Sequence, residues 1–389
     1  MKKIKQYLAF AIALLPAVAC GQNLTEVWGQ ISINNLTINA LEKQMEAEQI
    51  SNHVGLAPEN PEVEFAYLWG SPNSIGNRID VSVTQSFEFP TTYVYRSRIA
   101  DLKDEQVGLS LRSQMMEAYL EVGTLYYDII YQNTRIHDME RCLQFLSDVS
   151  AAYKQKLDAG EINIFDYNKV KLSELNMRQE KAHAETERDA MLLKIKQLNG
   201  GKSIDITLAE FPEITLPDSI TDWASRSPRL QWYDKQQEIA QQQLKLDRSL
   251  WAPQFFVGYM REQVPSETFQ GLKVGLSVPL WKNANTLRQT QLQNSAINMI
   301  AADEQFKLQA HLEGCYANTQ SMLRQIEEYR ALLASVDELE LLNQALDSGQ
   351  LSLVEYLYEL SAYHESHERF AEMQHDAALE FLELEAYRK

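Results

Sequence analysis

An internal repeat of 189 residues constrains this chain more than any other feature. The segment Leu157–Tyr167 recurs as Leu346–Tyr356, so that the turn glycines of the two copies lie 189 positions apart (349 − 160). Pro90 and Pro279, which each end a predicted strand, keep the same offset. No residue has been gained or lost over the 70 positions (160 − 90) between these landmarks. Such strict length matching indicates two structural copies arranged about a symmetry axis.

The first residues have the pattern of a secretory signal peptide, which we assign to residues 1–21. Three lysines precede an apolar run from Leu8 to Ala19, and small residues follow. This run is too short to span a bilayer, which takes about 20 apolar residues, and we expect no transmembrane helix elsewhere. The sequence therefore predicts an exported protein whose mature chain begins after Ala19 or Gly21.

The chain is strongly acidic. Its formal net charge of −18 becomes −21 without the three lysines of the signal peptide. A chain of this charge is a poor partner for nucleic acid or for an anionic lipid surface. The three cysteines, Cys20, Cys142 and Cys315, are far apart and predict neither a disulfide framework nor a metal knuckle. We expect folding to depend on side-chain packing and strand pairing.

Each repeat is predicted to contain a helix, two strands and a long helical hairpin, in that order. We place the first repeat at residues 22–199, an equatorial connector at 200–218 and the second repeat at 219–389. The first repeat is expected to contain helix 24–52, strands 63–69 and 79–89, and helices 92–157 and 166–199. The second is expected to contain helix 228–250, strands 253–260 and 272–280 around a loop with Pro265 and Gly271, helix 286–345 and a C-terminal helix.

The predicted helices are far longer than those of a compact domain. Helix 92–157 would be about 100 Å long at 1.5 Å per residue. Apolar residues at alternating spacings of four and three predict a coiled-coil seam in each hairpin. The seam residues are Cys142, Leu146, Val149 and Tyr153 in the first repeat, and Leu332, Val336, Leu339, Asn343 and Leu346 in the second. These stripes predict helix packing and are compatible with any function.

The strands indicate a membrane-spanning sheet. Strands of about eight to eleven residues can cross a bilayer at a tilt, with lipid on one face and water on the other. Four strands are too few to close a barrel, so we expect three chains to supply twelve strands and leave no edge in hydrocarbon. The alternative is a four-stranded soluble sheet beside a helical bundle. Aromatic residues near the predicted strand ends, where membrane interfaces favour them, are Tyr67, Trp69, Tyr93, Tyr95, Trp251, Tyr259 and Trp281.

Four stretches resemble a known family. They are the opening Leu24–Asn35, the helix-to-strand passages 55–62 and 250–254, the strand end 275–281, and the paired glycine turns. Together they make the mature chain similar to the TolC-type outer membrane efflux proteins, most of all the heavy-metal branch of CzcC and CusC type. The resemblance implies a mostly α fold with long coiled-coil hairpins and four transmembrane strands per chain. Three such chains would form a 12-stranded β-barrel and a periplasmic α-helical tunnel.

The resemblance places the two glycine turns at the periplasmic end of the tunnel, where an adaptor protein docks. The matching positions are Gly160 and Gly349, together with Leu157 and Leu346. A turn glycine of this kind is suited to the left-handed conformation that ends a helix.

The same resemblance implies a gate beside these turns. Asp166 and Glu355 occupy an acidic gate position, and Tyr358 stands where the family has a second acid. Each acid is either a helix-capping charge or part of a threefold ring at the constriction. The residues expected to line the barrel lumen are Asp80, Ser82, Thr84, Ser86, Glu88 and Lys273.

The histidines of the last helix do not predict a metal site. We expect His364, His367 and His375 to lie on solvated helix faces, because no carboxylate–histidine spacing typical of a closed site is evident. No catalytic triad or phosphate-binding loop stands out. The sequence therefore predicts neither an enzyme nor a cofactor.

The predicted function is a passive exit duct in the bacterial outer membrane, with a large periplasmic portion. An inner-membrane pump of the resistance-nodulation-division (RND) type would deliver substrates, heavy-metal cations or drugs, through a periplasmic adaptor. One alternative in the same structural class is the exit channel of a type I protein-secretion system. A second alternative, of another class, is a soluble periplasmic coiled-coil scaffold.

We also expect that Cys20 is not a lipid anchor, although residues 17–20 partly resemble a lipobox. If helix 24–52 ran as one rod towards the strand at Val63, it would begin about 40 Å from the barrel. An acyl chain on Cys20 would then lie far from the membrane.

Overall fold

The structure is a computed structural model that describes residues 23–281, 283–333 and 338–388. It divides into two compact units. Unit 1 comprises the described residues up to Asn34 together with Val122–Glu213 and Gln325–Ala378. Unit 2 comprises Asn35–Glu121, Ile214–Arg324 and the described residues from Leu379 onward. Each unit therefore draws on both sequence repeats, and the repeat boundaries themselves stay a prediction.

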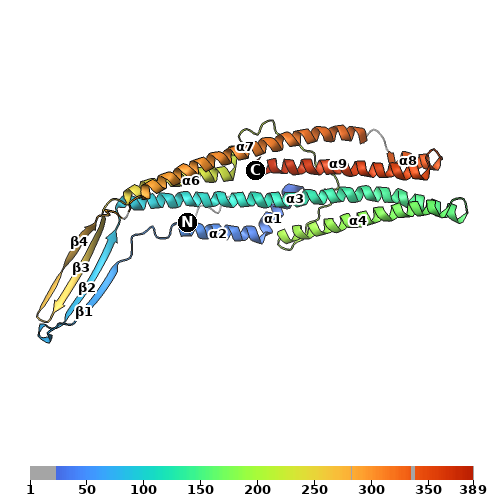
Figure 1. Cartoon of the computed structure of the whole chain (residues 1–389). Helices are drawn as coiled ribbons and strands as arrows, with labels where there is room; N and C mark the ends of the chain where they lie inside the picture. Colours follow the sequence, from blue (N-terminus) through green and yellow to red (C-terminus); the bar gives the residue numbers. More distant parts are fainter. Residues whose placement is uncertain (1–22, 282, 334–337, 389) are drawn as a thin grey trace, which may run out of the picture. The chain divides into compact units, whose positions relative to one another are not determined.

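The fold is mostly helical with one small antiparallel sheet, which confirms the predicted fold class (Figure 1). In chain order the elements are α1 (Leu24–Asn34), α2 (Leu36–Asn52), β1 (Glu62–Leu68), the 3-10 helix η1 (Asn73–Ile75), β2 (Arg78–Phe87), α3 (Pro90–Asp158), α4 (Ile164–Leu198), α5 (Trp223–Arg226), α6 (Pro228–Ser249), β3 (Gln254–Val264), β4 (Glu267–Ser277), α7 (Thr286–Leu333), α8 (Glu338–Asp347) and α9 (Leu353–Arg388).

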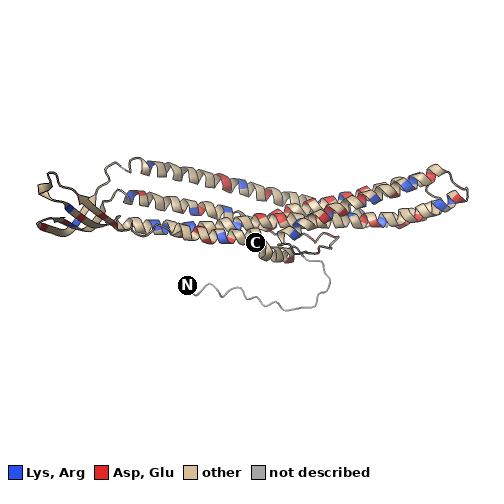
Figure 2. Ribbon diagram, turned by 90° about the horizontal axis from the view of Figure 1, so that it is seen from below, with Lys and Arg blue, Asp and Glu red and all other residues tan. Residues whose placement is uncertain are grey.

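The long helices form where the sequence predicted them. Helix α3 has 69 residues and begins at Pro90, where a proline costs nothing because its missing N–H would be unpaired anyway. The helix expected at residues 286–345 is described as α7 and α8, and residues 334–337, which include Val336, lie outside the described part. Acidic and basic residues are interspersed along the helices (Figure 2). Within the described residues no helix has a stretch long and apolar enough to cross a membrane.

The prediction of a single helix over residues 24–52 is wrong, because α1 and α2 are separate helices. Asn35 between them has an extended backbone (φ −69°, ψ 117°). Its buried side chain accepts hydrogen bonds from the N–H groups of Thr37 (2.8 Å) and Ile38 (3.1 Å). An asparagine that caps a new helix in this way competes with continuation of the old one.

This break removes the basis of the argument against a lipid anchor, which assumed one helix over residues 24–52. Cys20 and the predicted signal peptide at residues 1–21 lie outside the described residues. The state of Cys20 therefore stays a prediction without structural support.

The core of unit 1 joins α3, α4, α8 and α9. Cys142, Leu146 and Val149 of the first predicted seam are buried there, and Tyr153 packs against them. The buried cluster also contains Val170, Leu339, Leu353, Tyr356, Leu360 and Tyr363. The second seam is confirmed only in part, because Leu332 is 69% exposed in the last turn of α7.

Unit 2 contains the sheet and two further helical clusters. Trp223 of α5 packs with Leu312 and Cys315 of α7 and with Leu384 of α9. A second cluster joins Ile99 of α3 to Ile239 and Leu246 of α6. These contacts bring segments that are far apart in the sequence into one unit.

The sheet has the strand order β1-β2-β3-β4, and every neighbouring pair is antiparallel. Strands β3 and β4 form a hairpin in which Val264 pairs with Glu267, so that only Pro265 and Ser266 form the turn. The predicted loop around Gly271 is therefore wrong, because Gly271 lies inside β4 opposite Met260. A two-residue turn is enough to join antiparallel strands, and it leaves Gly271 free to continue the ladder.

We expect Leu146→Ala to destabilise unit 1 locally. Leu146 is fully buried in the core cluster, and truncation of such a leucine costs about 2–5 kcal/mol through lost burial and the cavity left behind. Hydrogen exchange should show this loss as faster amide exchange in α3, α4 and α9 around the substitution. Gln179→Ala on an exposed position of α4 is the control and should change exchange little. Equal effects of the two substitutions would contradict the assigned core.

Candidate functional site

The register of the sheet collects apolar side chains on one face. Val63 lies opposite Val83, Val83 opposite Tyr259, and Tyr259 opposite Leu272, which forms an apolar row across all four strands. Because side chains alternate between faces along a strand, every second residue joins this row's face. The apolar residues of this face, which we call the apolar face, are Val63, Phe65, Tyr67, Ile79, Val81, Val83, Phe87, Phe255, Val257, Tyr259, Leu272, Val274 and Leu276. The same face also carries the polar residues Gln85, Arg261, Gln263, Thr268 and Gln270, four of which lie toward the turn between β3 and β4. This face is largely uncovered, with an exposed fraction of 40% at Val83 and 83% at Leu272.

The opposite face of the sheet carries most of the charged and hydroxyl side chains of the strands, together with Phe256, Met260 and Phe269. Thr84 lies opposite Gly258, which lies opposite Lys273. By the same alternation, Asp80, Ser82 and Ser86 share this face with Thr84 and Lys273. The structure therefore brings together five of the six residues that we expected to line a lumen.

Two ion-pair arrangements, one on this face and one beyond the end of β2, were not visible in the sequence. Arg78 bridges two carboxylates, with Nε 2.7 Å from Asp80 Oδ1 and Nη1 2.8 Å from Glu262 Oε1. Glu88, the sixth expected lumen residue, lies beyond the end of β2 and pairs with Arg96 at 2.7 Å. The pairing of β2 with β3 explains why Arg78 and Glu262 meet, since Asp80 lies opposite Glu262.

Four of the seven aromatic residues expected near strand ends lie there, whereas Tyr93 and Tyr95 lie in α3 and Tyr259 lies within β3. Trp69, Trp251 and Trp281 flank the strands and are 80%, 44% and 78% exposed. Tyr67 in β1 makes an edge contact with Trp69, with 5.7 Å between the ring centroids. Tyr259, in contrast, lies at the middle of β3. The prediction failed for Tyr259 because β3 extends to Val264, beyond the residue 260 expected.

The two helical-hairpin turns have the same backbone structure. Gly160 and Gly349 have φ angles of +74° and +72°, which confirms the predicted left-handed conformation. In each turn the glycine N–H donates to the carbonyl of the leucine three residues before it. The N–H of the residue after the glycine donates to the carbonyl that lies five residues before that donor. The distances are 3.0 and 2.9 Å after α3, and 3.1 and 2.8 Å after α8. This pattern is the Schellman motif that commonly ends a helix.

The leucines and glycines assigned to docking differ in burial. Leu157 and Leu346 are half-buried, and Leu346 packs against the core cluster of unit 1. A Cβ atom on Gly160 or Gly349 would meet no heavy atom within 4 Å. Within the described chain the glycines are therefore required by their φ angles and not by close approach of another helix.

The acids after the turns help to begin the next helices. Asn163 caps α4 by accepting a hydrogen bond from the Asp166 N–H (3.0 Å), and its side-chain amide donates to Asp166 Oδ2 (2.7 Å). Ser352 and Glu355 form a reciprocal capping box: the Ser352 N–H donates to Glu355 Oε2 (2.8 Å), and the Glu355 N–H donates to Ser352 Oγ (3.3 Å). The sequence missed Asn163 and Ser352 as the capping residues, although both precede an acid by three positions.

The capping box also affects the charge of Glu355. The hydrogen bond from the Ser352 backbone N–H, followed by that from its hydroxyl, lowers the pKa of the Glu355 carboxyl. Glu355 is therefore ionised at neutral pH. Tyr358, one turn further along α9, is 71% exposed. Exposed apolar residues also occupy the first turns of both helices, namely Ile164, Phe165 and Val354.

The expectation that the α9 histidines lie on solvated faces is wrong. His375 Nε2 lies 2.8 Å from Asp128 Oδ1, and His367 Nδ1 lies 3.8 Å from Asp138 Oδ2. His364 is only 9% exposed. The reason is tertiary, because α9 packs this side against α3 and α4 within unit 1.

The two described cysteines are free thiols inside the helical cores. Burial raises the pKa of Cys142 and of Cys315 to about 12. Neither residue supplies a thiolate near neutral pH, so neither has the property of a reactive cysteine.

No family model and no curated protein matches this sequence. Solved structures do match. The CusC structure, described in terms of folding and transmembrane channel formation, aligns with a TM-score of 0.78 at 13% identity over 94% of this chain and 91% of that one. The CmeC outer membrane channel of Campylobacter jejuni aligns with a TM-score of 0.76 at 12% identity, over 94% and 86% of the two chains.

The open state of the MtrE outer membrane channel of Neisseria gonorrhoeae aligns with a TM-score of 0.76 at 12% identity, over 94% and 88% of the two chains. At these identities the likeness establishes the fold. It covers nearly the whole of this chain, and it confirms the single-chain fold that the resemblance to TolC-type channels implied, with long helical hairpins and a four-stranded sheet. These solved neighbours are channel proteins rather than enzymes.

We expect Gly349→Val to weaken the turn between α8 and α9, because a β-branched residue strains the left-handed conformation. The left-handed conformation costs an ordinary residue about 1–2 kcal/mol, and asparagine tolerates it best. Hydrogen exchange at the Gln350 amide, which bonds to the Ala345 carbonyl, should therefore accelerate more in Gly349→Val than in Gly349→Asn. A Cβ atom at position 349 would meet no heavy atom within 4 Å, so steric contact is not a competing cause. Equal exchange in the two variants would show that backbone strain does not weaken the turn.

Proposed function

We propose that this protein is an outer membrane channel of a tripartite efflux system, in which three chains form a 12-stranded barrel. The uncovered apolar face of the sheet carries the proposal. Soluble proteins rarely leave a contiguous apolar surface of this kind exposed, and lipid is a partner that covers such a surface without further protein. The polar face with Asp80, Ser82 and Lys273 would then line a water-filled lumen.

The edges of the sheet support the assembly of several chains. Within the described chain, β1 pairs only with β2, and β4 pairs only with β3. Backbone N–H and C=O groups at such edges find no water in hydrocarbon, so a membrane location requires that they pair with another copy. Three copies of four strands give twelve, an even number within the range of known bacterial barrels.

The hairpin turns are the proposed docking and gating region. Gly160, Gly349, Leu157 and Leu346 would receive a periplasmic adaptor, and the exposed Phe165 adds apolar surface beside them. Asp166, Glu355 and Tyr358 are the proposed gate. The capping box of Glu355 is compatible with this role, because its hydrogen bonds lower the pKa of the carboxyl and so favour the negative charge.

Transport in this proposal is passive, and an inner-membrane pump of the RND type supplies the energy through the adaptor. The proposed cargo is heavy-metal cations, which the sequence resemblance to the heavy-metal branch implies, or drugs. A type I secretion exit has the same architecture and would be revealed by a partner transporter ATPase. The soluble scaffold is disfavoured by the uncovered apolar face and would be revealed by membrane-free fractionation.

We predict that the protein extracted in detergent is a trimer and that the apolar face is required for it. Light scattering corrected for detergent should give three chains per particle. Val83→Lys on the apolar face should reduce trimer recovery from membranes, because a lysine facing the bilayer midplane costs about 2–4 kcal/mol. Ser82→Lys, on the opposite face of the same strand, is the matched control and should assemble normally. A folded wild-type monomer, or equal losses in both variants, would refute the proposed barrel.

We further predict that Asp166→Asn combined with Glu355→Gln lowers the cation preference of single channels in planar bilayers. Asparagine and glutamine can keep the local hydrogen bonds, so the double variant removes charge with little change of fold. The effect should be largest at low salt and shrink at 1 M salt, where the screening length is about 3 Å. Unchanged selectivity at low salt would mean that the two acids serve only as helix caps. Absence of any conductance in the wild-type protein would contradict the channel itself.

A further inference from the structure

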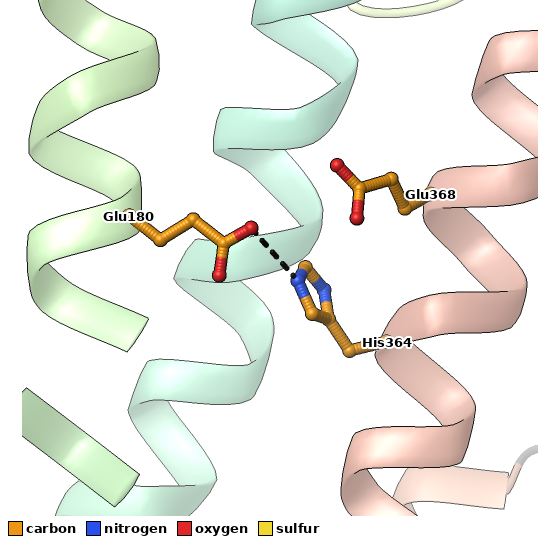
Figure 3. A group of neighbouring side chains, drawn as sticks. All are labelled: Glu180, His364 and Glu368. Atoms are coloured by element: carbon orange, nitrogen blue, oxygen red, sulfur yellow. Dashed lines mark ion pairs between the residues drawn. The ribbon is translucent and has the colours of Figure 1, made fainter. Parts of the chain in front are cut away.

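Three possible metal ligands converge inside unit 1. Glu180 projects from α4, and His364 and Glu368 project from adjacent turns of α9, four residues apart on one helix face. One ligand atom from each residue lies within 4.8 Å of the others. Figure 3 shows the three side chains directed toward one another beside α3. The group therefore joins two helices that are far apart in the sequence.

His364 is the unusual member of this group. It is 9% exposed, and neither of its two buried ring nitrogens has a hydrogen-bond partner in the described structure. Its closest polar contact is Nε2 to Glu180 Oε1 at 3.5 Å, which is too long for a good hydrogen bond. A buried imidazole without a partner is costly, and a bound cation at Nε2 would relieve that cost.

We propose that Glu180, His364 and Glu368 bind a divalent transition-metal ion of the zinc class. One imidazole nitrogen and two carboxylate oxygens form a donor set that Zn²⁺ accepts in proteins. The nitrogen donor favours such an ion over Mg²⁺ or Ca²⁺, which prefer oxygen ligands alone. Three protein ligands leave a fourth tetrahedral position for water. The bound ion would link α4 to α9.

Arg135 of α3 is the competing cation at this site. Its Nη2 lies 2.7 Å from Glu368 Oε1 and 3.5 Å from Glu180 Oε1. The guanidinium also has partners outside the site, because Nη1 donates to Gln132 Oε1 (3.3 Å) and Cζ lies 5.6 Å from the Tyr131 ring centroid. Arg135 can therefore release the carboxylates and keep two contacts. The two carboxylates together outweigh its single positive charge, so the group still attracts a divalent ion.

The internal repeat argues that this group is not a by-product of duplication. At the offset of 189 positions Arg135 corresponds to Arg324, so the arginine is present in both copies. The ligands are not, because the positions equivalent to Glu180, His364 and Glu368 hold Arg369, Leu175 and Gln179. The chain has therefore gathered the three ligands at only one of two equivalent places.

The test is Zn²⁺ binding to the purified mature protein, stripped of metal and free of any histidine tag. Competition with a zinc-binding dye should reveal one site per chain. Its affinity for Zn²⁺ should fall roughly tenfold or more in His364→Gln and in Glu368→Gln, since loss of a residue that merely supports a metal ligand already costs about that much. Arg135→Gln should bind Zn²⁺ more tightly, because the competing cation is removed. Circular dichroism should show that each variant keeps its helices.

A matched control is available on α4. His183 is exposed, and its Nδ1 lies 3.5 Å from Glu187 Oε1, the same separation as in the His364–Glu180 pair. His183→Gln should leave the affinity unchanged. The site would be overturned if neither His364→Gln nor Glu368→Gln lowered the affinity for Zn²⁺. It would also be overturned if His183→Gln lowered that affinity as much as they do.

Substitution by Co²⁺ provides a readout that does not depend on the folding of any variant. A ligand-field absorption band typical of tetrahedral Co²⁺ should appear in the wild-type protein and disappear on addition of excess Zn²⁺. An octahedral spectrum equal to that of aqueous Co²⁺ would overturn the proposal. Neither measurement requires transport, so this site and the proposed channel function can fail independently.

Discussion

Burial of apolar stripes between long, otherwise polar helices is the interaction on which the rest of this structure depends. Helix α3 has 69 residues, and a helix of this length with charges along its surface needs partners that cover its apolar side. In unit 1 those partners are α4, α8 and α9, which enclose Leu146 and Tyr356 in one core cluster. The hairpin turns, their caps and the group around His364 all depend on this packing.

The sheet exposes a row of apolar residues on one face. The helices bury many of their apolar residues in core clusters, although Ile33, Met299 and Phe306 among others are exposed. On the sheet, Val63, Leu272 and Val274 are more than two-thirds exposed on one face. The other face carries ion pairs such as that of Arg78 with Glu262. Within the described chain no layer covers the apolar face of the sheet, which is the observation behind the proposed membrane location. The proposed barrel, with lipid on one face and water on the other, would account for both faces.

The internal repeat explains the turns but not every feature beside them. Gly160 and Gly349 share their φ angles and hydrogen bonds because the backbone requirement at a helix end is local. The caps differ in chemistry, since an asparagine serves α4 and a serine–glutamate box serves α9. The carboxylate–imidazole group occurs in one copy only. Duplication therefore preserved the geometry of the hairpins, while individual side chains diverged toward separate roles.

The sequence by itself determined the features that depend on neighbouring residues. These are the long helices, the alternating strands and the left-handed glycines, because periodicity and backbone strain act locally. The helix break at Asn35 was also local, and the asparagine pair at residues 34–35 was the signal that could have revealed it. Only the tertiary structure decided that β3 continues to Val264, that α9 buries His364, and that Glu180 lies beside it across 184 positions of sequence (364 − 180). These outcomes depend on which surfaces of distant segments meet, and the pattern of one segment carries no information about its partner.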